Sequence, residues 1–281
     1  MEEIWRKAKV VALLKPEKDP KLPKSYRPIS LLCVLYKVYE RLLLGRIGPT
    51  VEEHLTADQS GFRAGRSCCG QVLNLTQFVE DGFERGNITG AVFVDLTAAY
   101  DTVNHRALLY KLTRMVKNTC VVNIIRSLLS NRRFFVEMDG KRSRWRDQKN
   151  GLPQGSVLAP LLFNVYTNDQ PTFRNIRRFI YADDLCLATQ ANDFGTIETR
   201  ISEALKVLTA YYRSWSLNPN PGKTQTCFFH LRNKDAKREM NIKWEGVTLK
   251  KTPNLVYLGV TLNRTLSFKE HVAKLRKKVS S

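Results

Sequence analysis

The sequence predicts an α+β fold in which helices cover an antiparallel sheet. Short apolar runs such as AVFVDL (91–96) have the length and composition of strands, whereas other runs carry apolar residues at helical spacing. These strand-like and helix-like segments interleave irregularly instead of alternating one by one, which is typical of α+β proteins. A chain of 281 residues is long enough to bury a substantial core.

The elements follow one another in a definite order. Residues 29–47 are dense in apolar residues and predict a buried helix, or a strand leading into one; residues 91–96 predict a strand. Two helices follow over 104–115, with Asn104 as N-cap, and over 120–131. Asp139-Gly140 predicts a hairpin turn. Residues 197–215 predict a helix that ends before Pro219, residues 224–230 and 255–262 predict strands, and residues 268–281 open a basic amphipathic helix.

The charge balance points to a polyanionic partner. Lys and Arg number 46 against 26 Asp and Glu, giving a net charge of +20 and a pI near 9.9. Nucleic acid is the first candidate and an anionic membrane the second. No apolar run approaches the roughly 18 residues of a spanning helix, and MEEIWRKAKVV lacks a signal-peptide pattern. We therefore expect an intracellular protein of the nucleus or cytoplasm, with no membrane partner. The six cysteines show no metal-ligand spacing.

Two adjacent aspartates interrupt the apolar run RRFIYADDLCLAT (177–189). Asp183 and Asp184 would repel each other there and resist leaving water. They could occupy a surface turn, or they could face a cation. Asp95 ends the strand-like run 91–96. If these strands are neighbours, the three carboxylates converge on a site of the kind that Mg²⁺ favours, and two such ions can assist phosphoryl transfer.

The order of several motifs resembles one known family. VFVDLTAAYDTVNH (92–105), NGLPQGSVLAPLLFNVYTND (150–169) and FIYADDLCLA (179–188) are similar to polymerase motifs A, B and C of reverse transcriptases, specifically of non-LTR (long-interspersed-element-like, jockey/CR1-type) retrotransposons. SYRPISLLCVLYKVYERLLLGRI (25–47) resembles the family's fingers segment, and LTADQSGFRAGRSCCGQVL (55–73) the segment after it. LNPNPGKTQTCFF (217–229) resembles motif D, and NLVYLGVTLNRTLSF (254–268) the hairpin region that follows.

The resemblance implies a right-hand polymerase with fingers and palm and a missing or truncated thumb. Fingers and the fingers–palm connection would occupy residues 1–90, the palm with its antiparallel sheet 91–262, and the start of a thumb or connection 263–281. The implied activity is RNA-directed DNA polymerase: copying of retrotransposon RNA into cDNA, with dNTPs added to a primer 3′-OH. RNA template and DNA primer would be the partners, and the full-length element could carry a fused endonuclease domain.

The resemblance also implies catalytic residues. Asp95, Asp183 and Asp184 would hold two Mg²⁺ ions, with Mn²⁺ as a possible substitute, and the backbone carbonyl of Leu96 would cover the metals or the triphosphate. Lys223 resembles the motif D lysine that protonates the leaving pyrophosphate.

Further residues would contact the nucleotide and the nucleic acid. Tyr100 occupies the family's steric-gate position and would exclude a ribose 2′-OH, while Gln154 resembles the nucleotide-pocket glutamine. Arg27, helped by Lys24, would grip the triphosphate. The nucleic-acid contacts would come from Arg63, Arg66 and Gly155.

Two other interpretations stay open. Asp101 directly follows the gate residue, and RNA-dependent RNA polymerases often place an acid just after motif A, so a viral-type RNA-templated polymerase is an alternative. A group II intron-type enzyme is another alternative within the polymerase class. A catalytically inactive or domesticated nucleic-acid-binding fragment is the other. The retained acids, Tyr100 and Gln154 favour the enzyme.

Overall fold

The structure is a computed structural model that describes residues 2–16 and 18–279, apart from the side chain of Lys24. The chain folds as two compact units, Met1–Thr56 with Ala98–Asp169 and Ala57–Thr97 with Gln170–Ser281. Each unit is therefore assembled from two separate stretches of sequence. The division into fingers, palm and thumb at residues 90 and 262 stays a prediction.

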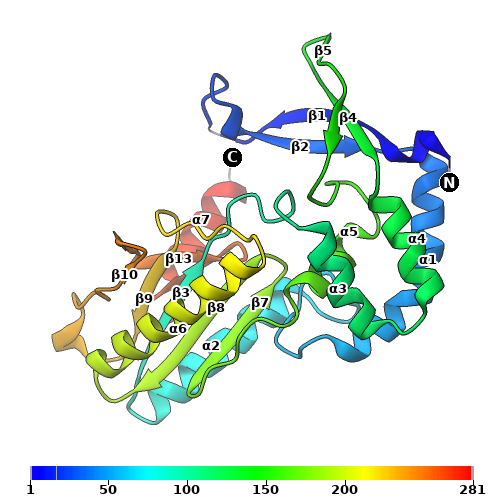
Figure 1. Cartoon of the computed structure of the whole chain (residues 1–281). Coiled ribbons are helices and arrows are strands. Elements are labelled where there is room, and N and C mark those ends of the chain that lie inside the picture. Colours follow the sequence, from blue (N-terminus) through cyan, green and yellow to red (C-terminus); the bar gives the residue numbers. More distant parts are fainter. Residues whose placement is uncertain (1, 17, 280–281) are drawn as a thin grey trace. The chain divides into compact units, whose positions relative to one another are not determined.

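The first unit combines a small sheet with four helices (Figure 1). Its strands are β1 (Lys7–Leu14), β2 (Tyr26–Leu31), β4 (Arg132–Met138), β5 (Lys141–Arg142) and β6 (Arg146–Gln148). Its α-helices are α1 (Val34–His54), α3 (His105–Met115), α4 (Thr119–Leu129) and α5 (Ala159–Thr167), and its 3-10 helices are η1 (Glu3–Arg6) and η2 (Pro23–Ser25). The strand order is β2-β1-β4-β5, with β6 on β4 and a parallel β1–β4 pair.

The helices of the first unit turn one apolar stripe inward. In α1 the buried positions recur every three or four residues, at Tyr36, Glu40, Leu43, Ile47 and Val51. Four of these residues suit a helix core. The exception is Glu40, a carboxylic acid that needs hydrogen-bond partners when it is buried. The helix therefore packs one face inward and keeps its other face exposed.

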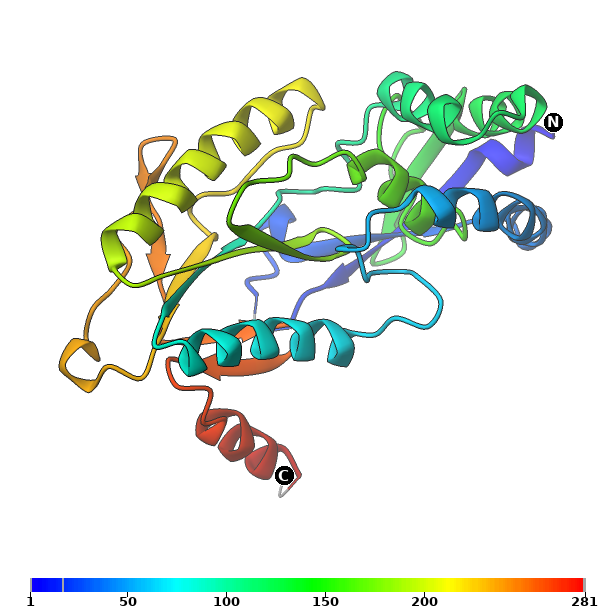
Figure 2. The ribbon, with the colours of Figure 1, turned by 90° about the horizontal axis from the view of Figure 1, so that it is seen from below.

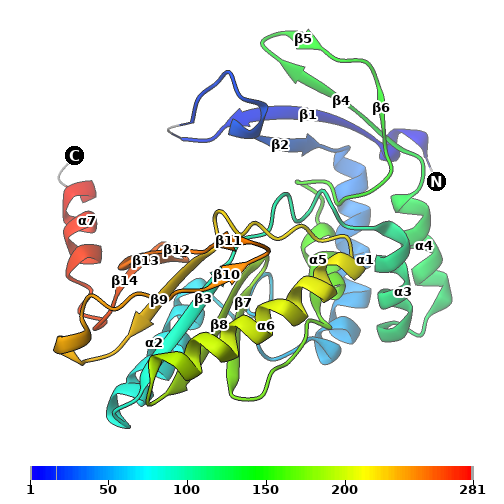
Figure 3. The same ribbon diagram turned by 60° about the vertical axis from the view of Figure 1, so that its left-hand side comes forward.

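The second unit is built on a five-stranded sheet (Figure 3). Its strands are β3 (Ile88–Val94), β7 (Ile176–Tyr181), β8 (Asp184–Ala191), β9 (Gln225–Phe229), β10 (Lys243–Trp244), β11 (Val247–Thr248), β12 (Lys250–Lys251), β13 (Asn254–Tyr257) and β14 (Val260–Asn263). Its helices are α2 (Cys68–Glu84), α6 (Phe194–Ser214), α7 (Lys269–Val279) and the 3-10 helix η3 (Asn233–Asp235). The sheet order is β12-β9-β3-β8-β7; β12 joins in parallel and the other pairs are antiparallel.

Helices cover both faces of this sheet. Figure 2 shows α2 and α6 on opposite sides of it. On the α2 side, Leu75 and Val79 pack with Ala91 and with residues of the β13–β14 hairpin such as Leu255. On the α6 side, a Cβ added to Gly90 of β3 would lie 2.1 Å from Ile197, so the helix comes too close for any side chain there. The central strand β3 is thus buried on both faces, which explains its continuous apolar run.

Most of the predicted elements are confirmed. The strand predicted at 91–96 is β3, and the helices predicted at 104–115, 120–131 and 197–215 are α3, α4 and α6. Asn104 caps α3 by accepting a hydrogen bond from the Ala107 amide at 3.0 Å. The run 255–262 differs from its prediction as one strand, because Leu258-Gly259 folds it back into the hairpin β13–β14. Within the described residues, no helix is both long and apolar enough to cross a bilayer.

Candidate active site

The pairing of β3 with β8 brings Asp95 to the turn that carries the two adjacent aspartates. Val94 pairs with Leu185 across these strands, so Asp95, which follows Val94, comes opposite Asp184, which precedes Leu185. Tyr181 pairs with Asp184 in the β7–β8 hairpin, which leaves Ala182 and Asp183 as its two turn residues. Three carboxylates from distant parts of the sequence therefore share one end of the sheet.

These carboxylates are close enough to interact electrostatically. Partial burial, followed by repulsion from Asp183 and Asp95, raises the pKa of Asp184 to about 6. Partial burial is also the main reason that the pKa of Asp183 is raised, with Asp95 adding repulsion. Asp183 and Asp184 nevertheless present much of their surface to solvent, so water screens part of this cost. The three charges destabilise one another unless a cation neutralises them.

The donor set fits a cation that a substrate helps to hold. Oδ2 of Asp95 is buried and has no hydrogen-bond partner among the described residues, and burial raises the pKa of this carboxyl. In the described part of the chain, no three His, Cys, Asp or Glu side chains form a group that could hold a metal ion by themselves. Mg²⁺ commonly uses one or two carboxylates together with substrate phosphates. The orphaned carboxylate oxygen is therefore suited to a shared site of that kind.

The segment 218–224 fixes the end of β3. The Asn220 amide donates to the Asp95 carbonyl at 2.8 Å, and the Asp95 amide donates to Oγ1 of Thr224 at 3.2 Å. Leu96 forms a bridge with Pro219. The side chain of Asn220 and the charge of Lys223 both lower the pKa of Asp95, against the larger effect of its burial. The sequence singled out Lys223 but not Asn220 or Thr224, whose contacts depend on pairing that no local pattern encodes.

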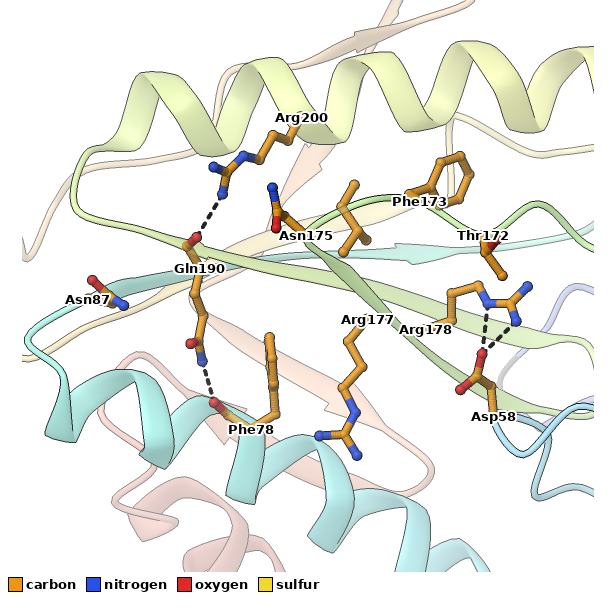
Figure 4. A pocket seen from close by; sticks show the side chains of 11 residues that line it. Asp58, Phe78, Asn87, Thr172, Phe173, Asn175, Arg177, Arg178, Gln190 and Arg200 are labelled. Atoms are coloured by element: carbon orange, nitrogen blue, oxygen red, sulfur yellow. Dashed lines mark hydrogen bonds and ion pairs between the residues drawn. The ribbon is translucent and has the colours of Figure 1, made fainter.

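A small cavity lies beside the carboxylates, and a larger cavity lies away from them. Asp95, Asp184 and Lys223 line a cavity of about 130 Å³. A cavity of about 600 Å³ lies at the other end of the β7–β8 hairpin, where Phe78 and Arg177 line it (Figure 4). Because Arg177 pairs with Ala188, several residues from the turn, the size of a cavity does not locate the acidic site here.

Arg63 and Arg66, predicted to contact nucleic acid, lie beside the hairpin in the same unit. Nη1 of Arg63 donates to the Gln59 carbonyl at 3.0 Å, and Nη1 of Arg66 donates to the Ala57 carbonyl at 2.8 Å. Arg66 is exposed and Arg63 is half-buried. Both guanidinium groups therefore brace the backbone of residues 57–59, and their predicted contact with nucleic acid stays a prediction.

The other unit brings together Tyr100 and the loop that contains Gln154. The Tyr100 ring stacks on Phe163, with centroids 4.5 Å apart and planes 11° from parallel. The Tyr100 carbonyl accepts a hydrogen bond from the Leu152 amide at 2.9 Å. The Gln154 side chain bonds to the Asp101 carboxylate, which lowers the pKa of Asp101 against the larger, raising effect of burial. The predicted nucleotide-contacting residues of motifs A and B are thus neighbours within this unit.

Gly155 is required by its backbone. Its φ is +126°, and an added Cβ would lie 2.5 Å from the carbonyl oxygen of Ser30. Only glycine fits this combination of a positive φ and a close backbone approach. The backbone carbonyl of the preceding residue, Gln154, accepts a hydrogen bond from the Ser30 amide at 2.7 Å, and this bond connects the loop to the end of β2. The predicted contact of Gly155 with nucleic acid stays a prediction.

The phosphate-binding residues predicted in the first unit are described only in part. Arg27 lies in β2, paired with Leu13, and its side chain is exposed. The side chain of Lys24 lies outside the described residues. Their predicted contact with the triphosphate is not tested by this placement.

Glu40 is a site residue that the sequence did not single out. This carboxylate is 1% exposed, and it accepts hydrogen bonds from the Ser156 hydroxyl and, at 2.9 Å, from the Val157 amide. It thereby anchors the loop of Gln154 and Gly155 onto α1. The signal was an acid on the apolar stripe of a helix, because a buried carboxylate is retained only where donors satisfy it.

Known proteins match this chain in sequence and in fold. Residues 14–262 match the family described as "Reverse transcriptase (RNA-dependent DNA polymerase)". The chain is 35% identical to the Drosophila melanogaster protein "Probable RNA-directed DNA polymerase from transposon BS" and 31% identical to the Drosophila funebris "RNA-directed DNA polymerase from mobile element jockey". These alignments cover 95% and 96% of this chain but only 30% of each relative.

Solved structures agree on the fold. Apo telomerase from Candida Tropicalis aligns with a TM-score of 0.63 at 11% identity, over 95% of this chain and 49% of that one. The form truncated from its C-terminal domain gives 0.61 at 12% identity, over 94% and 54%. The mixed α+β arrangement is therefore the predicted polymerase fold. With the family match over residues 14–262, the chain belongs to the reverse transcriptase family.

Proposed function

We propose that this chain is the polymerase core of a non-LTR retrotransposon reverse transcriptase, which copies retrotransposon RNA into cDNA. The observation that carries the proposal is the register of β3 on β8, which sets Asp95 against the Asp183–Asp184 turn. Such a cluster of mutually repelling carboxylates is costly without a function. The relatives are RNA-directed DNA polymerases of mobile elements, and the chain spans 30% of their length. The remainder of the full-length element would include an endonuclease domain.

Asp95, Asp183, Asp184 and the carbonyl of Leu96 would hold divalent cations. Reverse transcriptases generally use such ions, and we propose Mg²⁺, with Mn²⁺ as a substitute. Two bound ions would stabilise the charge on the attacking and leaving oxygens. Oδ2 of Asp95 supports this assignment, since it is buried and has no hydrogen-bond partner in the described part of the chain.

The reaction joins the primer 3′-oxygen to the α-phosphorus of a dNTP and breaks the bond from that phosphorus to the β-phosphate oxygen. The 3′-hydroxyl gives its proton to water, and pyrophosphate leaves. Lys223 would donate a proton to the pyrophosphate; its charge, which acts on Asp95, and its exposed side chain support this role. Most of the rate enhancement in such a reaction comes from positioning and charge stabilisation.

The nucleotide would be selected and held by Tyr100, Gln154, Arg27 and Lys24. The Tyr100 ring, held flat against Phe163, would exclude a ribose 2′-OH. Gln154 would bond to the incoming nucleotide or the template base, with Asp101 orienting its amide. Arg27, and Lys24 with it, would bind the triphosphate, a role that suits the fixed guanidinium fork of arginine.

RNA template and DNA primer would be held chiefly through their phosphates. The net charge of +20 supports this, as do the exposed Arg66 and the half-buried Arg63. A telomerase of the same fold has been solved in complex with a fragment of telomeric RNA. Binding should therefore weaken steeply as salt rises.

Primer extension on an RNA template tests the proposal. We expect Mg²⁺-dependent extension with dNTPs but not with NTPs. If the chain binds a primer–template tightly but extends it with neither nucleotide, it is a nucleic-acid-binding scaffold. If it extends with NTPs, it is an RNA-templated RNA polymerase. Either result would reject the proposed function.

A further inference from the structure

Residues 58–61 run along the outer edge of the β7–β8 hairpin, beside β7. The Ile180 amide donates to the Asp58 carbonyl at 3.1 Å, and the Ser60 amide donates to the Ile180 carbonyl at 2.8 Å. Gln59 forms a parallel bridge with Ile180. The segment 58–61 thus supports β7 immediately before the turn that carries Asp183.

Gln59 binds the turn itself through its side chain. This residue is 3% exposed. Its Oε1 accepts a hydrogen bond from the Ala182 amide at 2.9 Å, and its Nε2 donates to the Ala182 carbonyl at 3.2 Å. One side-chain amide therefore satisfies both backbone groups of the residue that precedes Asp183. The same Oε1 also accepts from the Gly61 amide at 2.7 Å, which fixes the orientation of the amide group.

Ala182 needs this support because of its backbone conformation. Its φ is +57°, in the left-handed region that side chains with a Cβ disfavour. Asp183 is not among the residues with a positive φ, so only the first residue of this two-residue turn has one, and such a turn ordinarily has glycine there. Residues held in such a conformation persist only where the surroundings enforce it, and they cluster at functional sites. Here the enforcing group is the Gln59 amide.

Three sets of contacts hold residues 58–61 in place. Oε1 of Gln71 in α2 accepts from the Ser60 hydroxyl at 2.8 Å, while its Nε2 donates to the Ile180 carbonyl at 3.2 Å. Arg178 of β7, whose side chain is 6% exposed, forms an ion pair with Asp58 at 2.6 Å (Figure 4). Gly61 packs so closely that a Cβ there would lie 2.2 Å from the Ala182 nitrogen.

We infer that Gln59 is a positioning residue of the polymerase: it holds Ala182 in its left-handed conformation and thereby sets the place of Asp183 and Asp184 opposite Asp95. The inference rests on the proposed function. Gln59 touches no reacting atom, and it acts through the backbone of the turn. A glutamine is needed because one group must both donate and accept, which neither a carboxylate nor an aliphatic side chain can do.

Gln59→Ala and Gln59→Glu test the inference in the chain as it exists here. We expect Gln59→Ala to lower kcat for dNTP incorporation by about 10- to 100-fold, with the KM for dNTP changed less than threefold. Gln59→Glu keeps an acceptor for the Ala182 amide but loses the donor, so its kcat should fall between those of the alanine variant and the wild type. Gln77→Ala is the matched control, because Gln77 is an exposed glutamine of α2 that bonds only Asp81 in the described structure.

Two readouts separate positioning from a general loss of stability. Hydrogen exchange should show faster exchange of the amides of 180–184 in Gln59→Ala, while the amides of α6 keep their wild-type rates. Adding Ala182→Gly to Gln59→Ala should restore at least a third of the lost kcat, on a logarithmic scale, because glycine adopts a positive φ without support. A variant that merely unfolds would not regain activity in this way.

Different results would reject the role of Gln59 and the proposed function. Wild-type kcat in Gln59→Ala, unchanged exchange over 180–184, or loss of kcat without any recovery by Ala182→Gly would each overturn the inference. Absence of primer extension by the wild-type chain would instead reject the proposed function, and the exchange experiment would still decide whether Gln59 holds the turn.

Discussion

The hairpins β4–β5 and β7–β8 both have two-residue turns. The residues of the first turn favour its backbone conformation, whereas those of the second do not. In β4–β5, Met138 pairs with Lys141 and the turn is Asp139-Gly140, with φ of +50° and +72°. This is the sequence that such a turn favours. In β7–β8, Tyr181 pairs with Asp184, and Ala182 adopts φ of +57° where glycine would be easier. The first turn is stable through its own residues, whereas the second depends on Gln59 from another part of the chain.

The difference shows in which of the two turns the sequence departs from turn preference. The turn of β4–β5 carries no acid opposite another acid, so its sequence could follow turn preference alone. The turn of β7–β8 must deliver Asp183 and Asp184 beside Asp95, and the surrounding structure enforces a backbone that its own sequence disfavours. In this turn, the deviation from local preference coincides with the candidate active site.

The strongest test exchanges the aspartate of each turn for asparagine. Asp183→Asn should lower polymerase activity by on the order of 10³-fold or more, because it removes a charge that would neutralise the cations. Asp139→Asn should leave activity within twofold, since asparagine also tolerates a positive φ. Primer extension measures both variants, and equal activity of the two would remove Asp183 from the catalytic set.

The next largest effect is expected where the 58–61 segment touches the turn. Gly61→Ala would force a Cβ to within 2.2 Å of the Ala182 nitrogen. We expect a loss of about 2 kcal/mol in the free energy of unfolding and about a tenfold loss of activity.

Gly45→Ala is the control for this variant. Gly45 lies in α1 with nothing within 4 Å of an added Cβ, so alanine should stabilise the helix by up to about 1 kcal/mol. Denaturant unfolding measures both variants. A Gly61→Ala chain as stable as the wild type would show that the turn is not closely packed.

Exchanging glycine and alanine between the two turns should shift stability in opposite directions. Gly140→Ala places a Cβ at φ of +72° and should cost about 1 kcal/mol. Ala182→Gly removes a Cβ at φ of +57° and should raise the free energy of unfolding by about 0.5 kcal/mol. Thermal unfolding of both variants makes the comparison. If Ala182→Gly is destabilising, the turn carries no conformational strain.

Another effect concerns the pH dependence of stability without added metal. The pKa of Asp184 is about 6 in the fold against a usual value of 3.8, so its charged form is disfavoured in the folded chain. This costs stability above about pH 6 and costs nothing below pH 3.8, where the group is protonated in both states. Asp184→Asn should therefore raise Tm at pH 7.5 and not at pH 3.5.

The size of this shift is limited by solvent. A difference of about two pKa units corresponds to roughly 3 kcal/mol, but Asp184 is exposed by surface area, so we expect about 1 kcal/mol, or about 2 °C in Tm. Asp139→Asn should change Tm by less than about 1 °C at both pH values. An equal shift for Asp184→Asn at both pH values would contradict the repulsion between the carboxylates.

The sequence by itself determined the helices, most strands, the Asp139-Gly140 turn and the identity of the acidic residues, because periodicity, capping and turn preference act over a few neighbouring residues. Only the tertiary structure decided which residues hold those acids in place. Gln59, Asn220 and Thr224 act through hydrogen bonds to backbone that is distant in sequence. Such contacts leave no local pattern, since a buried polar group is explained only by the partner that the fold brings to it.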